Sequence, residues 1–110
     1  MARKVLFVCT ANLQRSPTAE HLFQGWKGVW QAKSAGTDPD PGKNPLTQEL
    51  VDWAEVIIVM EPHHSQHIRA HYRCSPDKVR VLNLQDIYYR NDPKLKRELM
   101  KKVPTILEKN

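Results

Sequence analysis

The sequence predicts a three-layer α/β fold, in which helices cover both faces of a four-stranded parallel sheet. Short runs of β-branched and aromatic residues alternate along the chain with segments of helical periodicity. The clearest of these runs have no polar alternation, which is typical of strands buried on both faces. Right-handed crossovers between such strands favour the order 2-1-3-4. With 110 residues and no repeat, low-complexity tract or linker, we expect one domain over residues 1–110.

The first part of the chain predicts a strand, a helix and a second strand. Residues 4–9 (KVLFVC) form a continuous run suited to a central strand. Ser16 is the expected N-cap of the first helix, with Pro17 at its first position. Residues 29–35 are the second expected strand, closed by Gly36. The helix between the strands has one apolar stripe, formed by Ala19, Leu22, Phe23 and Trp26.

The rest of the chain continues the alternation after a loop at residues 37–45 (TDPDPGKNP), which is rich in proline. We expect, in order, a short helix within 46–54, a strand at 56–61, a polar helix at 62–72, a strand at 79–84 and a last helix from Pro93. Pro104 should kink or interrupt that last helix, because proline lacks the N–H that a helix interior needs.

Charge and composition restrict the partners. The formal net charge of +5 favours anions, without separating phosphate esters from nucleic acids. No nucleic-acid motif or aromatic stripe accompanies the basic residues near the C-terminus, so we expect a solvated helix face and no nucleic-acid partner. Two cysteines are too few for a disulfide scaffold, which favours the cytoplasm. No run approaches the ~20 apolar residues of a membrane span, so no membrane partner is expected. The basic residues near the C-terminus, which we expect on the solvated helix face, are Lys94, Lys96, Arg97, Lys101 and Lys102.

The stretch VCTANLQRSP, residues 8–17, is the candidate reaction centre. It follows the predicted central strand, where the winding of the sheet reverses and ligands bind in such folds. It leads into a helix N-terminus, which attracts anions, and Asn12 tolerates the left-handed backbone of an anion-binding loop. Arg15 can hold two oxygens of a phosphate group at once. A thiol at Cys9 would lose its proton readily there, and the Ser16 hydroxyl could donate to the thiolate.

With Cys-x5-Arg-Ser placed between a buried strand and a helix, the sequence resembles the low-molecular-weight protein tyrosine phosphatases, as a shortened member. The resemblance continues in SAGT (34–37), VIIVME (56–61) and DIYYRNDP (86–93), which occur in the family's order. It implies the flavodoxin-like, phosphotyrosine protein phosphatase I-like fold and a hydrolase acting on phosphotyrosine-like phosphomonoesters. The implied substrates are a phosphorylated protein or a small aryl phosphate, with inorganic phosphate or a similar oxyanion as product or inhibitor. No cofactor or metal is implied.

The resemblance also implies roles for individual residues. Cys9 would form a phosphocysteine, Arg15 would bind the phosphate, and Asp86 would be the general acid and base. Tyr88 matches an aromatic residue at the pocket wall. The implied phosphate-binding loop consists of Cys9, Thr10, Ala11, Asn12, Leu13, Gln14, Arg15 and Ser16.

Three departures from the family pattern affect this interpretation. Ala11 stands where glycine is usual, which is acceptable only if its φ is negative. Gln14 replaces a common second cysteine that could protect an oxidised nucleophile as a disulfide. The chain is also shorter around residues 36–46, where the family builds part of the pocket wall, so the substrate preference stays open.

Several alternatives remain at the level of sequence. Asp92 competes with Asp86 as the acid, although it could equally cap the last helix. Cys74 reads as a lone thiol, which counts against an arsenate reductase-like enzyme on the same scaffold. A non-catalytic anion- or nucleic-acid-binding module is the third hypothesis. The histidines at 64, 67 and 71 are expected on an exposed, weakly basic helix face without a metal.

Overall fold

The computed structural model describes residues 2–109 and contains a four-stranded parallel sheet. Its strands are β1 (Arg3–Cys9), β2 (Trp30–Gly36), β3 (Val56–Val59) and β4 (Val79–Val81). The helices are α1 (Arg15–Phe23), α2 (Gln48–Trp53), α3 (Pro62–His71) and α4 (Pro93–Lys109), with short 3-10 turns η1 (Trp26–Gly28) and η2 (Pro76–Lys78). The strand order is β2-β1-β3-β4 with all pairs parallel, which confirms the predicted fold.

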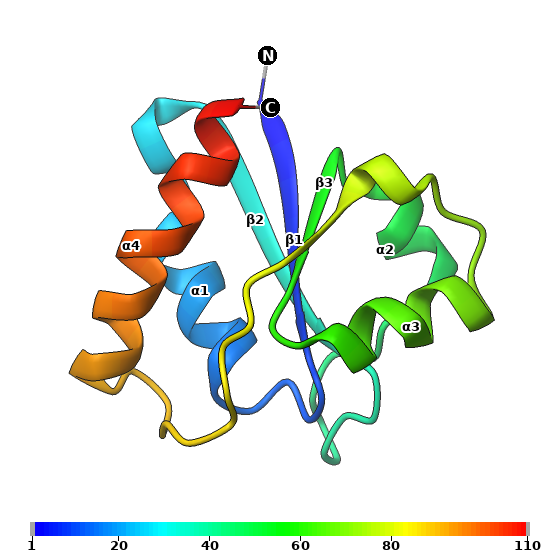
Figure 1. Cartoon of the computed structure of the whole chain (residues 1–110), viewed down its shortest axis with the longest axis horizontal. Helices are drawn as coiled ribbons and strands as arrows, with labels where there is room; N and C mark the ends of the chain where they lie inside the picture. The colour runs from blue at the N-terminus through cyan, green and yellow to red at the C-terminus, as the bar shows by residue number, and fades with distance from the viewer. Residues whose placement is uncertain (1, 110) are drawn as a thin grey trace.

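Helices α1 and α4 cover one face of the sheet, and α2 and α3 cover the other (Figure 1). Strand β1 lies at the switch point between β2 and β3, so the loop that follows it opens at the carboxyl edge of the sheet. Figure 1 shows this loop and the irregular segment after β4 at the same end of the molecule. The topology therefore brings the two halves of the candidate site together.

Side chains of β1 alternate between two hydrophobic cores. Phe7 belongs to the core beneath α1 and α4, where it contacts Phe23 with ring centroids 5.9 Å apart. Leu6 and Val8 belong to the core beneath α2 and α3. All of these residues are fully buried. A strand buried on both faces is held firmly, and so is the start of the loop that it carries.

The expected start of α1 was wrong, and so was the alternative that Pro104 interrupts α4. Helix α1 begins at Arg15 with Gln14 as its N-cap, so Ser16 does not cap it; the Ser16 hydroxyl is instead bonded within the site. Helix α4 continues through Pro104 without interruption. Pro104 lacks the N–H that would bond the carbonyl of Met100, a residue on the exposed side of the helix, while buried Leu99, Val103 and Leu107 anchor both halves of the helix.

Gly36, at the end of β2, is required by a close approach of the loop. A Cβ atom at this position would lie 2.5 Å from the Thr10 carbonyl oxygen and 2.9 Å from the Asn12 nitrogen. Any side chain here would push the loop away from the sheet. Among residues 2–109, no helix is long and apolar enough to cross a membrane.

Candidate active site

A cavity of about 140 Å³ lies at the carboxyl end of β1. Its walls combine loop residues with one residue from the segment after β4. The cavity is small beside typical small-molecule sites of ~300–1,000 Å³, so it suits the reacting end of a substrate. The lining residues are Cys9, Ala11, Leu13, Gln14, Arg15 and Asp86.

The backbone of the loop is shaped as the sequence predicts. Asn12 has φ of 55°, in the left-handed region, and Ala11 is not among the described residues with positive φ. The carbonyl oxygens of Cys9, Thr10 and Ala11 accept hydrogen bonds from backbone N–H groups in the segment 37–40. Because the C=O and N–H of a trans peptide point in opposite directions, the N–H groups of these peptides point away from that segment. This arrangement favours an anion-binding concavity.

A chain of hydrogen bonds fixes the cysteine. The Cys9 sulfur lies 2.9 Å from the Ser16 Oγ. Asn12 Nδ2 donates to Ser16 Oγ and to Ser34 Oγ, each at 3.0 Å. Since the Ser16 oxygen accepts from Asn12, its hydroxyl proton is available to the Cys9 sulfur, with the Ala35 carbonyl at 3.4 Å as its other acceptor. A thiolate at Cys9 would receive this hydrogen bond in a buried setting.

Arg15 is buried and oriented by contacts on one of its nitrogens. Its Nη1 donates to Glu61 Oε1 at 2.5 Å and to the Leu84 carbonyl oxygen at 2.7 Å. Both hydrogens of that nitrogen are thereby used, so Nε and Nη2 remain as a two-pronged donor. The Nε atom lies 3.7 Å from Asp86 Oδ1, which directs this fork toward the cavity.

Glu61 supports the arginine from the end of β3. Burial opposes the charge of its carboxylate, but the hydrogen bond and positive charge of Arg15 outweigh this and hold the pKa of Glu61 below its usual value. Glu61 also begins α3 through a capping box with His64. The same residue thus fixes both the arginine and the start of α3.

His64 is fully buried, which corrects the expectation of an exposed histidine face. Its Nδ1 accepts from the Glu61 N–H at 3.0 Å, so Nε2 carries the proton and donates to Thr10 Oγ1 at 2.8 Å. Burial chiefly, with the nearby charges of His63 and Arg15, lowers the pKa of His64 to about 4. A neutral imidazole therefore ties α3 to the loop that follows β1.

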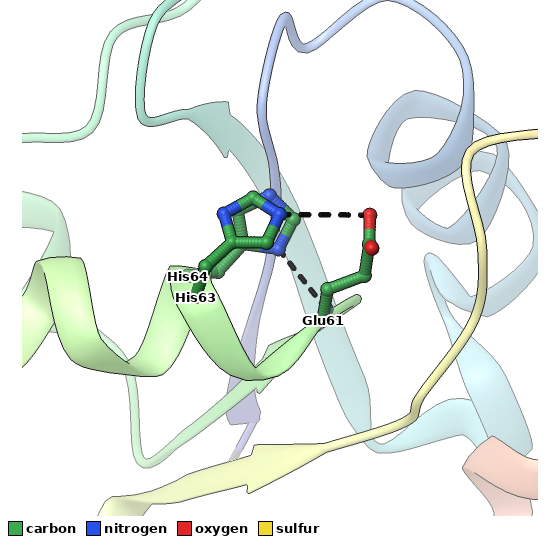
Figure 2. Close-up of side chains that lie close together, drawn as sticks. All are labelled: Glu61, His63 and His64. Carbon is green, nitrogen blue, oxygen red and sulfur yellow. Dashed lines mark hydrogen bonds and ion pairs between the residues drawn. The ribbon is translucent and has the colours of Figure 1, made fainter.

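Glu61, His63 and His64 lie close enough for their ligand atoms to fall within 4.8 Å of one another. His63 Nε2 lies 3.6 Å from Glu61 Oε1. Figure 2 shows this contact and the hydrogen bond from the Glu61 N–H to His64. Both nitrogens of His64 are occupied by hydrogen bonds, and the Glu61 carboxylate is bound to Arg15. The trio is better explained as support for the loop than as a metal centre.

The structure places the two candidate acids differently. Asp86 lines the cavity with a largely exposed side chain. Asp92 is buried, and its Oδ1 accepts from the Lys94 N–H at 2.9 Å at the start of α4, as an N-cap does. Tyr88 is half-buried against the core under α4 and is not among the cavity-lining residues. Its role as a pocket wall stays a prediction.

Sequence reasoning missed three residues that shape the site: Glu61, His64 and Gly36 as a contact of the loop. The sequence indicated Glu61 only as the last residue of VIIVME, one of the stretches that resemble the family. For His64 a signal did exist, because Ile68, the one large apolar residue of α3, lies four positions later on the same helix face. Both residues are buried in the structure.

The fold and site define a class of α/β protein that carries a cysteine and an arginine in the loop at the switch point of a parallel sheet. Residues 4–50 match the family described as "Low molecular weight phosphotyrosine protein phosphatase". The chain is 32% identical to a protein-arginine-phosphatase of Bacillus subtilis (strain 168), over 71% of this chain and 69% of that protein. The chain belongs to this low-molecular-weight phosphatase family.

Two solved structures extend the likeness over nearly the whole chain. A low molecular weight protein tyrosine phosphatase from Bacillus subtilis has a TM-score of 0.76 at 26% identity, covering 97% of this chain and 98% of that one. An arginine phosphatase in which serine replaces a cysteine, with a phosphorylated active-site serine, has a TM-score of 0.74 at 25% identity, covering 97% of each chain. The family thus contains relatives named for tyrosine and for arginine substrates.

Proposed function

We propose that this protein hydrolyses phosphotyrosine-like phosphomonoesters through a phosphocysteine on Cys9. The observation that carries the proposal is that Cys9, Arg15 and Asp86 line one cavity, although Asp86 is far from the other two in sequence. A nucleophile, an anion-binding fork and an acid together are what phosphoryl transfer needs. A binding module would need only the fork.

In the first step the Cys9 thiolate attacks phosphorus, and the bond from phosphorus to the aryl oxygen breaks. Asp86 delivers its proton to the leaving oxygen, so that a neutral phenol departs. The Nε and Nη2 groups of Arg15 and the loop amides hold the equatorial oxygens as charge develops on them. The Ser16 hydroxyl supports the thiolate before attack.

In the second step water attacks phosphorus, and the bond from phosphorus to sulfur breaks. The carboxylate of Asp86 accepts a proton from the water, which restores the acid for the next cycle. Inorganic phosphate leaves, and the Cys9 thiolate is regenerated. Because the product has the charge and shape that the loop binds, phosphate or a similar oxyanion should inhibit.

An aryl leaving group could contact apolar side chains beside the reacting atoms. Leu13 is 37% exposed and Ile87 70% exposed, the former lining the cavity and the latter adjoining Asp86 in sequence. Aromatic rings gain from such contacts, whereas a guanidinium group would need hydrogen-bond acceptors, of which the cavity offers the Asp86 carboxylate. The relative named for arginine phosphate makes phosphoarginine the second candidate substrate. Both substrates would use the same nucleophile.

An arsenate reductase-like reaction has less support. Both cysteines are free, and Cys74 lines a different cavity from Cys9. Burial raises the pKa of the Cys74 thiol, which makes it a poor attacking group. We assign the phosphatase reaction to a cytoplasmic protein of one domain with phosphorylated proteins or small aryl phosphates as substrates.

The test is hydrolysis of 4-nitrophenyl phosphate and of phosphoarginine by the wild type, Cys9→Ser and Asp86→Asn. We expect aryl phosphatase activity in the wild type and none above buffer in Cys9→Ser. With phenyl phosphate, whose leaving group needs a proton, Asp86→Asn should lose about 10²–10⁴-fold in kcat/KM. Asp92→Asn is the matched control and should retain activity if it remains folded. A preference for phosphoarginine would reverse the substrate assignment, and activity in Cys9→Ser would refute the mechanism.

A further inference from the structure

Gln14 occupies an unusual position at the start of α1. It stands at the N-cap, where Ser, Thr, Asp or Asn would bond the first turn of the helix, and its side chain makes no such bond. Its side chain instead lines the cavity. A polar side chain released from capping can act on another element of the site.

The Gln14 amide reaches across to the segment that carries Asp86. Its two neighbours there are both hydrogen-bond acceptors, so the amide nitrogen faces them. In this orientation the nitrogen donates to Asp86 Oδ1 at 3.3 Å and to the Tyr88 carbonyl oxygen at 3.1 Å. One side chain thus contacts both the carboxylate and the backbone that supports it.

The Asp86 segment depends on such contacts for its position. It lies between the end of β4 at Val81 and the start of α4 at Pro93, without regular structure. Helix α1 holds it at two further points: Arg15 donates to the Leu84 carbonyl, and Thr18 Oγ1 accepts from the Asn91 N–H at 2.9 Å. Gln14 supplies the middle attachment, next to the carboxylate itself.

The carboxylate of Asp86 has little else to orient it. Its side chain is 58% exposed, and the nearest charged group of the described residues is Arg15 Nε at 3.7 Å, beyond ordinary hydrogen-bond distance. A general acid must be held within hydrogen-bond reach of the leaving oxygen. Cysteine, which is common at this position in the family, is too short and too weak a donor to make both contacts.

We propose that Gln14 is a positioning residue that holds Asp86 toward the leaving group, an inference that rests on the proposed function. It adjoins the nucleophile's loop and fixes the acid by two hydrogen bonds from one amide. Glutamine, in place of the cysteine that is common in the family, therefore links the loop that carries Cys9 to the segment that carries Asp86. It acts through Asp86 and takes no proton itself.

The test compares two aryl phosphates that differ in their need for an acid. The 4-nitrophenolate group leaves readily without a proton, whereas phenolate does not. Gln14→Met keeps the size of the side chain and removes both donors. We expect kcat/KM to fall about 3- to 10-fold for phenyl phosphate, the effect of a typical hydrogen bond, and to change little for 4-nitrophenyl phosphate. Gln14→Asn, whose amide is one methylene shorter, should show the same selective loss.

Double variants with Asp86→Ala decide whether the effect passes through the acid. In that background Gln14→Met should have no further effect on phenyl phosphate. Gln24→Met is the matched control, because it removes an acceptor for the Ala32 N–H away from the cavity. This control should leave the ratio of the two esters unchanged.

The possible failures are distinct. An equal loss with both esters, or an undiminished loss in the Asp86→Ala background, would overturn the role of Gln14. So would unchanged kinetics in folded Gln14→Met and Gln14→Asn. If Asp86→Ala itself shows no dependence on the leaving group, or Cys9→Ser remains active, the proposed function fails instead.

Discussion

Acidification is expected to destabilise the folded protein through one buried imidazole, that of His64. In the native state its Nδ1 must stay unprotonated to accept from the Glu61 N–H, and its pKa is lowered to about 4 by burial and nearby positive charge. In the unfolded chain the same group has a pKa near 6.5. Between these values the unfolded state binds more protons than the native state, so stability falls as the pH falls.

The size of the effect follows from the difference between the two pKa values. At pH 5.5 the unfolded state gains about 1 kcal/mol relative to the native state, and at pH 4.5 about 2 to 3 kcal/mol. The effect approaches its limit of about 3 kcal/mol well below pH 4. Because a small domain has only ~5–15 kcal/mol of stability in all, this one residue should contribute strongly to acid unfolding.

The assay is urea unfolding of the wild type and His64→Gln at several values between pH 7 and pH 4.5. Glutamine offers an acceptor and a donor like the neutral imidazole but does not titrate in this range. The wild type should lose about 2 kcal/mol more than the variant over the interval. All other titrating groups are common to both proteins, so their effects cancel in the comparison.

A difference in stability between the two proteins that is independent of pH would refute a neutral, buried His64. If the variant folds poorly, an NMR titration of the wild type provides a second measurement, in which the chemical shifts of the His64 imidazole are followed as the pH falls. The His64 ring should keep its neutral chemical shifts down to about pH 5. A ring that titrates near its ordinary value would contradict the structure in the same way.

Three further predictions concern the loop. Gly36→Ala should lower kcat/KM by about 10²-fold, since its Cβ would lie 2.5 Å from the Thr10 carbonyl and displace the loop; near-normal kinetics would mean that the loop yields freely. Asn12→Ala should be about 1 kcal/mol less stable to urea than Asn12→Gly, because only glycine adopts the φ of 55° without strain, and equal stabilities would contradict that conformation. Peroxide should inactivate Cys9 with poor recovery by thiols, because Cys74 lines a different cavity; full recovery would show that another thiol protects it.

The fold was predictable because its signals are local. Continuous apolar runs mark buried strands whatever their neighbours, and right-handed crossovers leave few ways to order them. The start of α1 was misplaced because contacts made in the folded protein, and not local signals, decide it. Ser16 and Pro17 have the local preferences of a helix start, but the bonds of the Ser16 hydroxyl to Cys9 and Asn12 outweigh them.

The sequence by itself determined the strand, the loop and the spacing of Cys9 and Arg15, because these residues are neighbours on one turn of chain. Only the tertiary structure decided what supports them. Glu61 contacts Arg15 across 46 positions, and His64 contacts Thr10 across 54. No local preference records such a pair, because each bond exists only once the sheet places the ends of β1 and β3 side by side. The contact of Gln14 with Asp86 arises in the same way, from the return of the chain after β4.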